Sequence, residues 1–319
     1  MAVQTVSDVK NISDAMIAQI QTVVSGADHT VRMLIAAVLC GGHVLLEDLP
    51  GSGKTTLAKA FAKASGCDMC RVQCTPDLMP ADITGFQMLQ TTEQGHREMV
   101  FRKGAVFTNV LLADEINRMA PRTQSGLLEC MAEGQVSCDG VTYELPKPFL
   151  VIATQNPVEL QGTFPLPEAQ LDRFFMQLSM GRPDREREME ILTARQLTDP
   201  LESLQPAANA AELCAAQQVV RTVTASEAML QYLLSLAEAT RRHKGIRFGL
   251  STRGVLAVRR AAQAAAAMQG RAYLLPDDIK EVFPAVCCHR LHASSHSVSD
   301  AKAAEKIVQE LLAAVEVPR

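Results

Sequence analysis

The chain has 319 residues and a mass of 34.6 kDa, a length that corresponds to about two domains. Hydrophobic residues make up 47% of the sequence and charged residues 21%, so the chain can bury a core and is not disordered throughout. The formal net charge of −4 gives no overall basic excess. We therefore expect no nucleic-acid partner, although a local basic patch would escape this argument.

Membrane-spanning and secreted proteins are also disfavoured. The longest nearly pure apolar stretch, Met33 to Gly42, is about half the length of a membrane helix. Met1 to Asn11 has no basic start followed by an apolar core, so no secretory signal is expected. The nine cysteines are an odd number in a chain too long to need disulfides. We therefore expect a cytoplasmic protein with free thiols and no membrane insertion.

Helical and strand patterns alternate along the first half of the chain. Apolar residues at helical spacing predict helices over Ile12 to Val24 and Asp28 to Cys40. The apolar run His43 to Glu47 predicts a buried strand, and a glycine-rich turn then leads to a helix from Lys54 to about Ala64. Further buried strands are expected at Met69 to Cys74, Asn109 to Ala113 and Phe149 to Thr154, with helices such as Arg122 to Ala132 between them. This alternation predicts an α/β fold with a parallel sheet covered by helices on both faces.

Two changes of pattern follow. Gln135 to Cys138 and Val141 to Leu145, joined by Asp139-Gly140, predict a β-hairpin with a type I′ turn. Strand signals almost disappear after Gly181 to Asp184, so we expect an α/β domain over residues 1–182 and a helical domain over 183–319. Helices in the second domain are predicted at Glu186 to Leu197, Ala211 to Val220, Ser226 to His243, Thr252 to Met268 and Asp277 to Arg290, with a loop at Thr198 to Asn209.

The turn after the first strand has the residue types of a phosphate-binding loop, Asp48-Leu49-Pro50-Gly51-Ser52-Gly53-Lys54-Thr55-Thr56. Its glycines let backbone N–H groups turn toward a polyphosphate, and the following helix adds a positive dipole. Lys54 would reach the β- and γ-phosphates, and Thr55 would offer its hydroxyl to Mg²⁺. The one departure from the motif is Asp48, which stands where the first glycine usually lies.

Polar residues follow the third and fourth predicted strands. Asp114 can hold Mg²⁺, usually through water, and Glu115 is placed to orient or deprotonate an attacking water. An acidic pair alone is as often a solvated turn, but the phosphate loop favours the catalytic interpretation. Asn156 would sense a γ-phosphate and position the water, although Asn-Pro is also a common turn signal.

Two arginines would contact phosphate from outside the loop. Arg173, at the end of the first domain, would reach the nucleotide of a neighbouring subunit as an arginine finger. Arg253, near a helix start in the second domain, would touch the phosphates from a lid. For either residue taken alone, a surface salt bridge explains the arginine equally well.

A cluster of metal-binding residue types lies near the end of the second domain, namely Cys287, Cys288, His289, His292 and His296. The spacing of two cysteines and two histidines that is typical of zinc sites is absent. A helix end with solvated imidazoles is the preferred interpretation, and metal binding stays open.

These motifs together resemble the MoxR family of AAA+ ATPases over about Ile12 to Val317. The most specific stretches are Leu112 to Arg118 and Ala153 to Pro157, the latter continued from Gly162 to Phe174. The resemblance implies a P-loop AAA+ core followed by a small helical lid. It assigns Lys54 and Thr55 to Walker A, Asp114 and Glu115 to Walker B, Asn156 to sensor 1, Arg173 to the arginine finger and Arg253 to sensor 2. It also places Asn117, Arg118, Arg122 and Glu168 at a subunit interface or near the phosphates.

The resemblance further implies a helix-2 insert at about residues 85–104 and a hairpin before sensor 1 at about 134–145, both facing the pore of a ring that is usually hexameric. It implies Mg²⁺-dependent ATP hydrolysis coupled to remodelling, assembly or activation of a protein complex, often with a von Willebrand factor A domain partner. A nucleic-acid motor or transcription activator and the motor subunit of a metal chelatase share this core and remain alternatives. Whether Arg253 serves its own or a neighbouring nucleotide stays open.

Overall fold

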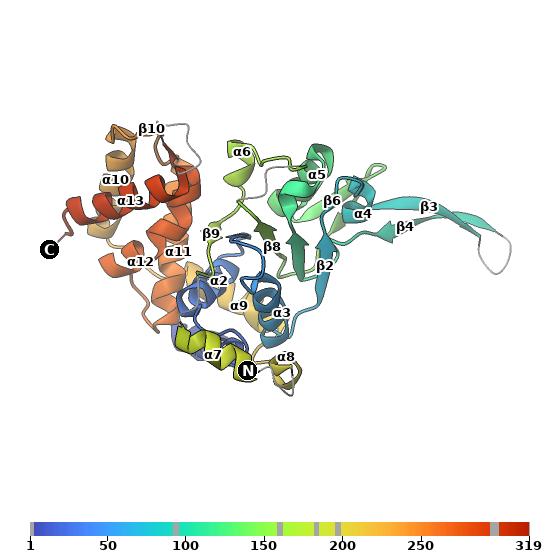
Figure 1. Cartoon of the computed structure of the whole chain (residues 1–319), viewed down its shortest axis with the longest axis horizontal. Coiled ribbons are helices and arrows are strands. Elements are labelled where there is room, and N and C mark those ends of the chain that lie inside the picture. Colours follow the sequence, from blue (N-terminus) through green and yellow to red (C-terminus); the bar gives the residue numbers. More distant parts are fainter. Residues whose placement is uncertain are drawn as a thin grey trace.

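The chain folds into a five-stranded sheet with helices on both faces and a helical region beside it (Figure 1). The computed structural model describes residues 3–91, 96–157, 162–181, 185–194, 199–293 and 300–318. The predicted domain boundary at residues 182–184 lies outside these described residues. None of the helices described is both long enough and apolar enough to cross a lipid bilayer.

Two helices precede the sheet, α1 (Val6–Gln21) and α2 (Asp28–Leu39). The first begins at Val6, earlier than the predicted Ile12, because Thr5 and Asp8 form a capping box. The Asp8 N–H donates to the Thr5 hydroxyl, and the Thr5 N–H donates to the Asp8 carboxylate. Helix α2 is buried along nearly its whole length, which fits its apolar sequence.

The sheet has the strand order β2-β5-β8-β1-β9, and every neighbouring pair is parallel. Its strands are β1 (Val44–Glu47), β2 (Met69–Gln73), β5 (Val110–Asp114), β8 (Leu150–Gln155) and β9 (Met176–Leu178). The predicted α/β fold is therefore confirmed. The edge strand β9 was not predicted, because three residues are too few to show a periodic pattern.

Alternate residues of the central strands face two different cores. Leu112 and Ile152 lie in the core shared with α1, α2 and α3 (Lys54–Ala64). Leu111 and Val151 lie in the core shared with α5 (Pro121–Glu133). Shorter helices complete this part, namely α4 (Pro80–Thr84), the 3₁₀ turn η1 (Ile116–Arg118) and α6 (Glu168–Leu171).

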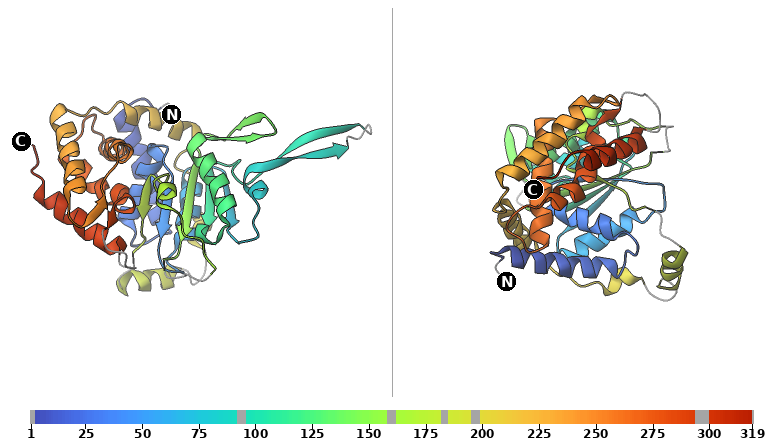
Figure 2. Two further views of the ribbon diagram at one scale, coloured as in Figure 1. Left: turned by 90° about the horizontal axis from the view of Figure 1, so that it is seen from above. Right: turned by 90° about the vertical axis from the view of Figure 1, so that its left-hand side faces the viewer.

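Two antiparallel hairpins extend from the α/β part (Figure 2). One pairs β3 (Gly85–Thr91) with β4 (Arg97–Lys103) and projects away from the body, over the residues where the insert is predicted. The other pairs β6 (Gln135–Cys138) with β7 (Val141–Glu144). Its turn residues Asp139 and Gly140 have φ of 49° and 78°, as a type I′ turn requires. The rings of Phe101 on β4 and Tyr143 on β7 stack at 3.9 Å, so the two hairpins are in contact.

The helical region contains α7 (Arg185–Ala194), α8 (Pro200–Ser203), α9 (Ala210–Arg221), α10 (Glu227–Arg242), α11 (Thr252–Met268), α12 (Pro276–Cys287) and α13 (Asp300–Ala314). The sequence patterns do not predict α8, which lies in the expected loop, or α13. They also do not predict the small ladder of β10 (Ile246–Phe248) and β11 (His292–Ala293). The helix predicted through Arg290 ends at Cys287, and a 3₁₀ turn η2 (Cys288–Arg290) follows.

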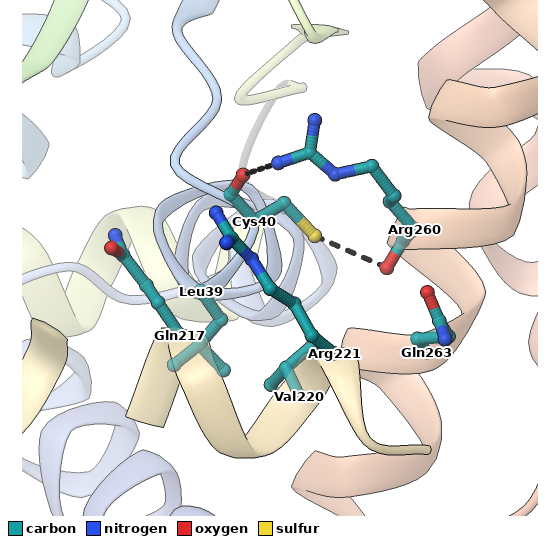
Figure 3. A pocket seen from close by; sticks show the side chains of 7 residues that line it. All are labelled: Leu39, Cys40, Gln217, Val220, Arg221, Arg260 and Gln263. Carbon is teal, nitrogen blue, oxygen red and sulfur yellow. Dashed lines mark hydrogen bonds between the residues drawn. The ribbon is translucent and has the colours of Figure 1, made fainter. Parts of the chain in front are cut away.

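The two parts share one hydrophobic core, because α1 and α2 pack against α9 and α11. At this contact the Arg260 guanidinium donates to the Cys40 carbonyl, and the Cys40 thiol donates to the Arg260 carbonyl at 3.1 Å (Figure 3). A small pocket lies there, lined by Leu39, Cys40, Gln217, Val220, Arg221, Arg260 and Gln263. The helical region is thus fixed to the first two helices as well as to the sheet.

Candidate functional site

The loop from Asp48 to Gly53 joins β1 to the N-terminus of α3. Gly51 and Gly53 have φ of +80° and +92°, a left-handed conformation that favours glycine. Gly53 is the N-cap of α3, so the free N–H groups of the first helical turn lie beside the loop. The Lys54 ammonium donates to the carbonyls of Asp48 at 2.6 Å and Leu49 at 3.0 Å. Burial lowers the pKa of Lys54, and four nearby carboxylates oppose this shift.

Asp48, the departure from the phosphate-loop motif, has a structural partner. Its carboxylate accepts a hydrogen bond from the Ser179 hydroxyl at 3.0 Å and another from the Met180 N–H. The Asp48 side chain therefore connects the start of the loop to the segment that follows β9. The backbone carbonyl of Asp48 accepts from Lys54. A glycine at this position would lose the connection made by the side chain.

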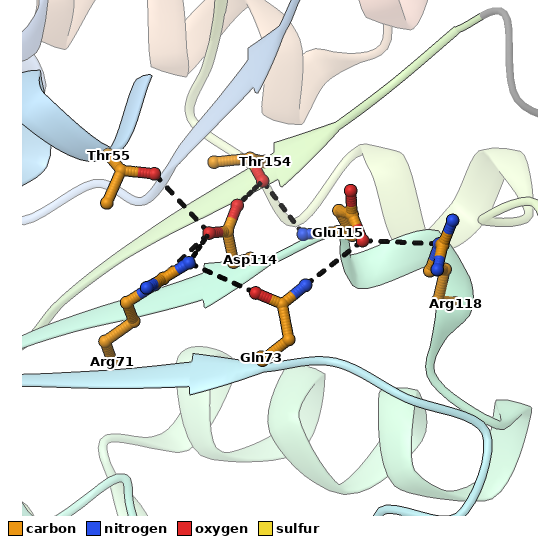
Figure 4. A network of polar contacts seen from close by, with 7 residues as sticks. All are labelled: Thr55, Arg71, Gln73, Asp114, Glu115, Arg118 and Thr154. Carbon is orange, nitrogen blue, oxygen red and sulfur yellow. Dashed lines mark hydrogen bonds and ion pairs between the residues drawn. The ribbon is translucent and has the colours of Figure 1, made fainter. Parts of the chain in front are cut away.

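Asp114 lies at the meeting point of three elements (Figure 4). Its Oδ1 accepts from the Thr154 hydroxyl of β8 at 2.6 Å. Its Oδ2 accepts from the Thr55 hydroxyl of α3 at 3.4 Å and from Arg71 Nη2 of β2 at 2.7 Å. The residue is only 8% exposed, so each contact is made in a partly dehydrated environment. The predicted pair Thr55 and Asp114 is thus brought together.

Glu115 follows Asp114 with a φ of 60°, which is uncommon for a residue other than glycine. Its N–H donates to the Thr154 hydroxyl at 2.8 Å, so one hydroxyl joins the backbone of Glu115 to the carboxylate of Asp114. The Glu115 carboxylate accepts from Gln73 Nε2 at 3.1 Å and lies 3.2 Å from Arg118 Nε. The backbone bond to Thr154 and the contacts with Gln73 and Arg118 thus hold the Glu115 carboxylate in one place.

Two polar residues of β2 belong to this network and were not predicted. Arg71 and Gln73 are two residues apart, so their side chains leave the same face of the strand. Arg71 Nη2 also donates to Gln73 Oε1 at 3.2 Å. Two polar side chains at alternate positions, near the end of a strand read as apolar, are the signal that would have indicated them.

The two predicted arginines lie in a second group of contacts. Arg173 Nη1 donates to the Leu128 carbonyl at 2.7 Å. Arg253 Nε lies 3.8 Å from the carboxylate of Asp172, the residue before Arg173. Asp172 also accepts from Arg290 at 2.7 Å, a buried arginine that was not predicted. Asn156 directly follows β8 and so lies at the sheet edge that carries Asp114.

An open groove lies beside the phosphate loop. It is lined by Val23 to Ala27 between α1 and α2, by Ser52, Gly53 and Thr56 of the loop, and by Met180 and Gly181. The buried Ser52 hydroxyl has no hydrogen-bond partner among the described residues. A mostly apolar wall that ends at a phosphate loop fits a planar base joined to a polyphosphate. The sequence patterns do not predict this wall, because Val23 to Ala27 carries only helix-end signals.

The two described histidines near residue 290 contact separate partners. The buried His289 ring contacts the Phe174 carbonyl at 3.0 Å, and His292 lies 3.2 Å from the Glu168 carboxylate. His296 lies outside the described residues. Within the described ranges, no three His, Cys, Asp or Glu side chains are grouped as metal ligands. All nine cysteines are free thiols.

Comparisons with known proteins agree with this geometry. Residues 43–176 match the family described as "ATPase family associated with various cellular activities (AAA)", and residues 238–311 match "AAA lid domain". The chain is 42% identical over 299 residues to the uncharacterized protein YeaC of Bacillus subtilis, covering 94% of this chain and 92% of that one. It is 36% identical over 310 residues to chaperone MoxR1 of Mycobacterium tuberculosis, covering 94% and 81%.

A third relative, protein MoxR of Methylorubrum extorquens, is 34% identical over 294 residues, covering 86% of this chain and 85% of that one. The fold is similar to a crystal structure from Cytophaga hutchinsonii that is described as a proposed ATPase. The TM-score is 0.87 and the identity 35%, with 98% of this chain and 97% of that one covered.

Proposed function

The chain belongs to the MoxR family of AAA+ ATPases, and we propose that it couples magnesium-dependent ATP hydrolysis to the remodelling, assembly or activation of a protein complex. The observation that carries this proposal is the position of Thr55, which follows the lysine of the phosphate loop, 3.4 Å from the Asp114 carboxylate. Nucleotide binding and ATP hydrolysis belong to the family. The name of the relative chaperone MoxR1 supports the chaperone part of the proposal.

The residues at this point fit a magnesium ion. Magnesium prefers oxygen ligands, and here a hydroxyl and a carboxylate oxygen face each other beside the loop. In our proposal Thr55 and Asp114 hold the ion, the latter through water. The bound ion would neutralise the negative charge of the β- and γ-phosphates.

Each remaining residue of the site has a role in the proposal. The backbone from Asp48 to Thr56 and the Lys54 ammonium bind the phosphates. Glu115, held by Gln73 and Arg118, orients the attacking water and accepts its proton. Asn156 contacts the γ-phosphate from the end of β8. The groove beside Val23 to Ala27 receives the base.

We further propose that the protein works as a ring, with six subunits as the expected number. Arg173 and Arg253 contact Leu128 and Asp172, and not their own phosphate loop within the described chain. This supports a role for both arginines at the nucleotide of a neighbouring subunit, where they would stabilise the charge of the transition state. The hairpins β3-β4 and β6-β7 would then face the pore and the client. The free thiols support a cytoplasmic location.

The test is a pull-down from native lysate with the full-length Glu115→Gln variant as bait. Loss of the base should leave ATP bound without turnover, so a ring in this state should keep its client. Enrichment of a multi-subunit protein complex or a von Willebrand factor A domain protein with Mg-ATP, but not with Lys54→Ala as the matched bait, supports the proposal. Enrichment of nucleic acid that nuclease removes would replace it with a nucleic-acid motor.

A further inference from the structure

Arg71 has no role in the site as proposed so far, yet it makes the shortest contact to the metal-facing oxygen of Asp114. Its Nη2 lies 2.7 Å and its Nε 3.3 Å from Asp114 Oδ2. The Thr55 hydroxyl contacts this same oxygen at 3.4 Å. Two nitrogens of one guanidinium on one carboxylate oxygen make a charge-assisted contact, which is stronger than a neutral hydrogen bond.

A magnesium ion held through water needs a donating water at Asp114 Oδ2, the oxygen that Arg71 already contacts. The ion would bring two positive charges beside Asp114 Oδ2, and like charges separated by a few ångströms repel strongly when they are partly shielded from water. Asp114 has only 12% of its side chain exposed, whereas Arg71 has 46% of its side chain exposed. The arginine is therefore the partner that can move toward solvent, and the aspartate is the one that stays.

We propose that Arg71 is an internal counter-ion of Asp114 that competes with the divalent cation and is displaced when the cation binds. This inference rests on the magnesium site of the proposed function. In the metal-free protein Arg71 neutralises a carboxylate that is only 8% exposed. The competition raises the cation concentration that the site needs, because the ion must first break the contact between Arg71 and Asp114.

The same displacement would reach Glu115. Arg71 Nη2 donates to Gln73 Oε1 at 3.2 Å, and Gln73 Nε2 donates to the Glu115 carboxylate at 3.1 Å (Figure 4). Departure of Arg71 removes the contact that fixes the Gln73 amide. Cation binding at Asp114 is thereby coupled to the hydrogen bonding of Glu115 through two side chains of β2. Arg71 is a positioning residue in this scheme, since it acts through Asp114 and Gln73.

The test measures Mn²⁺ binding to the full-length, nucleotide-free protein by electron paramagnetic resonance of the unbound ion. Arg71→Gln removes the competing charge and should bind Mn²⁺ about twofold to fivefold more tightly than wild type, the range of a partly exposed ion pair. Arg118→Gln is the matched control, because it removes the same charge from the neighbouring carboxylate Glu115. It should change the affinity less than twofold. Arg71→Lys keeps the charge and should stay near wild type.

The outcomes separate this inference from the proposed function. Asp114→Asn should lose Mn²⁺ binding in every background, and an Asp114→Asn variant that binds like wild type would overturn the metal site and the inference together. If Asp114→Asn loses binding but Arg71→Gln binds no more tightly than wild type, only the role of Arg71 is overturned. A gain in Arg118→Gln equal to that in Arg71→Gln would also overturn it. Thermal unfolding of each variant identifies any that does not fold.

Discussion

Arg290 donates from Nε to Asp172 Oδ1 at 2.7 Å, and this ion pair joins the turn η2, which follows α12, to the segment that carries Arg173. The Arg290 side chain is 5% exposed and also donates to the carbonyls of Phe174 at 2.7 Å and Phe175 at 3.1 Å. The guanidinium thus fixes the backbone after Arg173 from the helical region. A movement of the helical region would therefore shift the backbone on both sides of Arg173, the proposed arginine finger.

The first prediction concerns this pair. Asp172→Asn removes the negative charge and leaves a buried arginine without a counter-ion, so the free energy of unfolding should fall by about 2–4 kcal/mol. Urea denaturation measures it. The control is Arg253→Ala, which removes the more distant partner of the same carboxylate, 63% exposed, and should cost less than about 1 kcal/mol. Equal losses in the two variants would contradict the assignment of Arg290 as the main partner.

Thr154 supplies the second prediction. Its hydroxyl accepts from the Glu115 N–H and donates to Asp114, and Thr154→Val keeps the shape but removes both bonds. The buried N–H and carboxylate would lose a partner, so we expect a loss of about 1–3 kcal/mol in stability. We also expect the turnover number to fall at least tenfold, because Glu115 is held by this bond. Thr154→Ser should retain most of the activity, because it keeps the hydroxyl. Steady-state ATPase assays measure both variants, and equal turnover numbers would contradict the prediction.

The third prediction follows from arginines that serve a neighbouring subunit. Arg173→Ala leaves a complete nucleotide site but no finger, whereas Lys54→Ala leaves a finger but no nucleotide site. Each variant alone should be inactive. Mixed subunits should regain part of the ATPase activity, since some interfaces combine an intact site with an intact finger. Arg173→Ala mixed with Asp114→Asn should do the same. A mixture as inactive as its components would argue that Arg173 serves its own subunit.

Acid stability gives the fourth prediction. Burial lowers the pKa of His43 from 6.5 to about 4 and that of His289 to about 3. Both imidazoles are neutral in the folded chain, and the unfolded chain takes up protons as the pH falls below 6.5. The folded state then binds fewer protons than the unfolded state, so stability should change little between pH 7 and pH 8 and fall steadily from pH 6.5 to pH 4.

Urea midpoints across this pH range measure the effect. The fall should be less steep in His43→Gln, because one buried imidazole no longer has to remain neutral in the folded state. His29→Gln is the control, because His29 is exposed. The steepness of the fall should not change in that variant. A fall equally steep in His43→Gln and wild type would contradict the prediction.

Local signals explain what could be predicted from sequence. Helix α3 begins at Lys54 as expected, because glycines precede it and apolar residues repeat at helical spacing. Thr55 and Asp114 could be predicted as neighbours, since parallel strands place their carboxyl ends at one edge of the sheet. The type I′ turn at Asp139-Gly140 likewise depends on two residues alone.

Contacts between distant segments explain what could not be predicted. Asp172 and Arg290 are 118 residues apart, and neither has a neighbour in sequence that indicates the other. In the sequence Arg71 is only a polar residue within a strand. Its contact with Asp114 arises because β2 pairs with β5, a pairing that the sequence patterns do not specify. The short ladder of β10 and β11 depends on the packing of α13, which was itself not predicted. These contacts form only when segments far apart in the sequence are brought together by the fold.

The stacked rings of Phe101 and Tyr143 give the projecting hairpin the properties of a lever. Each strand of β3-β4 has seven residues, a length of roughly 23 Å at about 3.3 Å per residue. Tyr143 belongs to the β6-β7 hairpin, and β6 follows directly from α5, whose Leu128 carbonyl holds Arg173. Four residues, or about 13 Å, separate Phe101 from the far end of the hairpin at Thr91 and Arg97, so a rotation of about 10° at the stacked rings would carry that end through about 2 Å. A small rotation where the two hairpins touch would therefore be amplified along β3-β4 into a larger displacement of its far end.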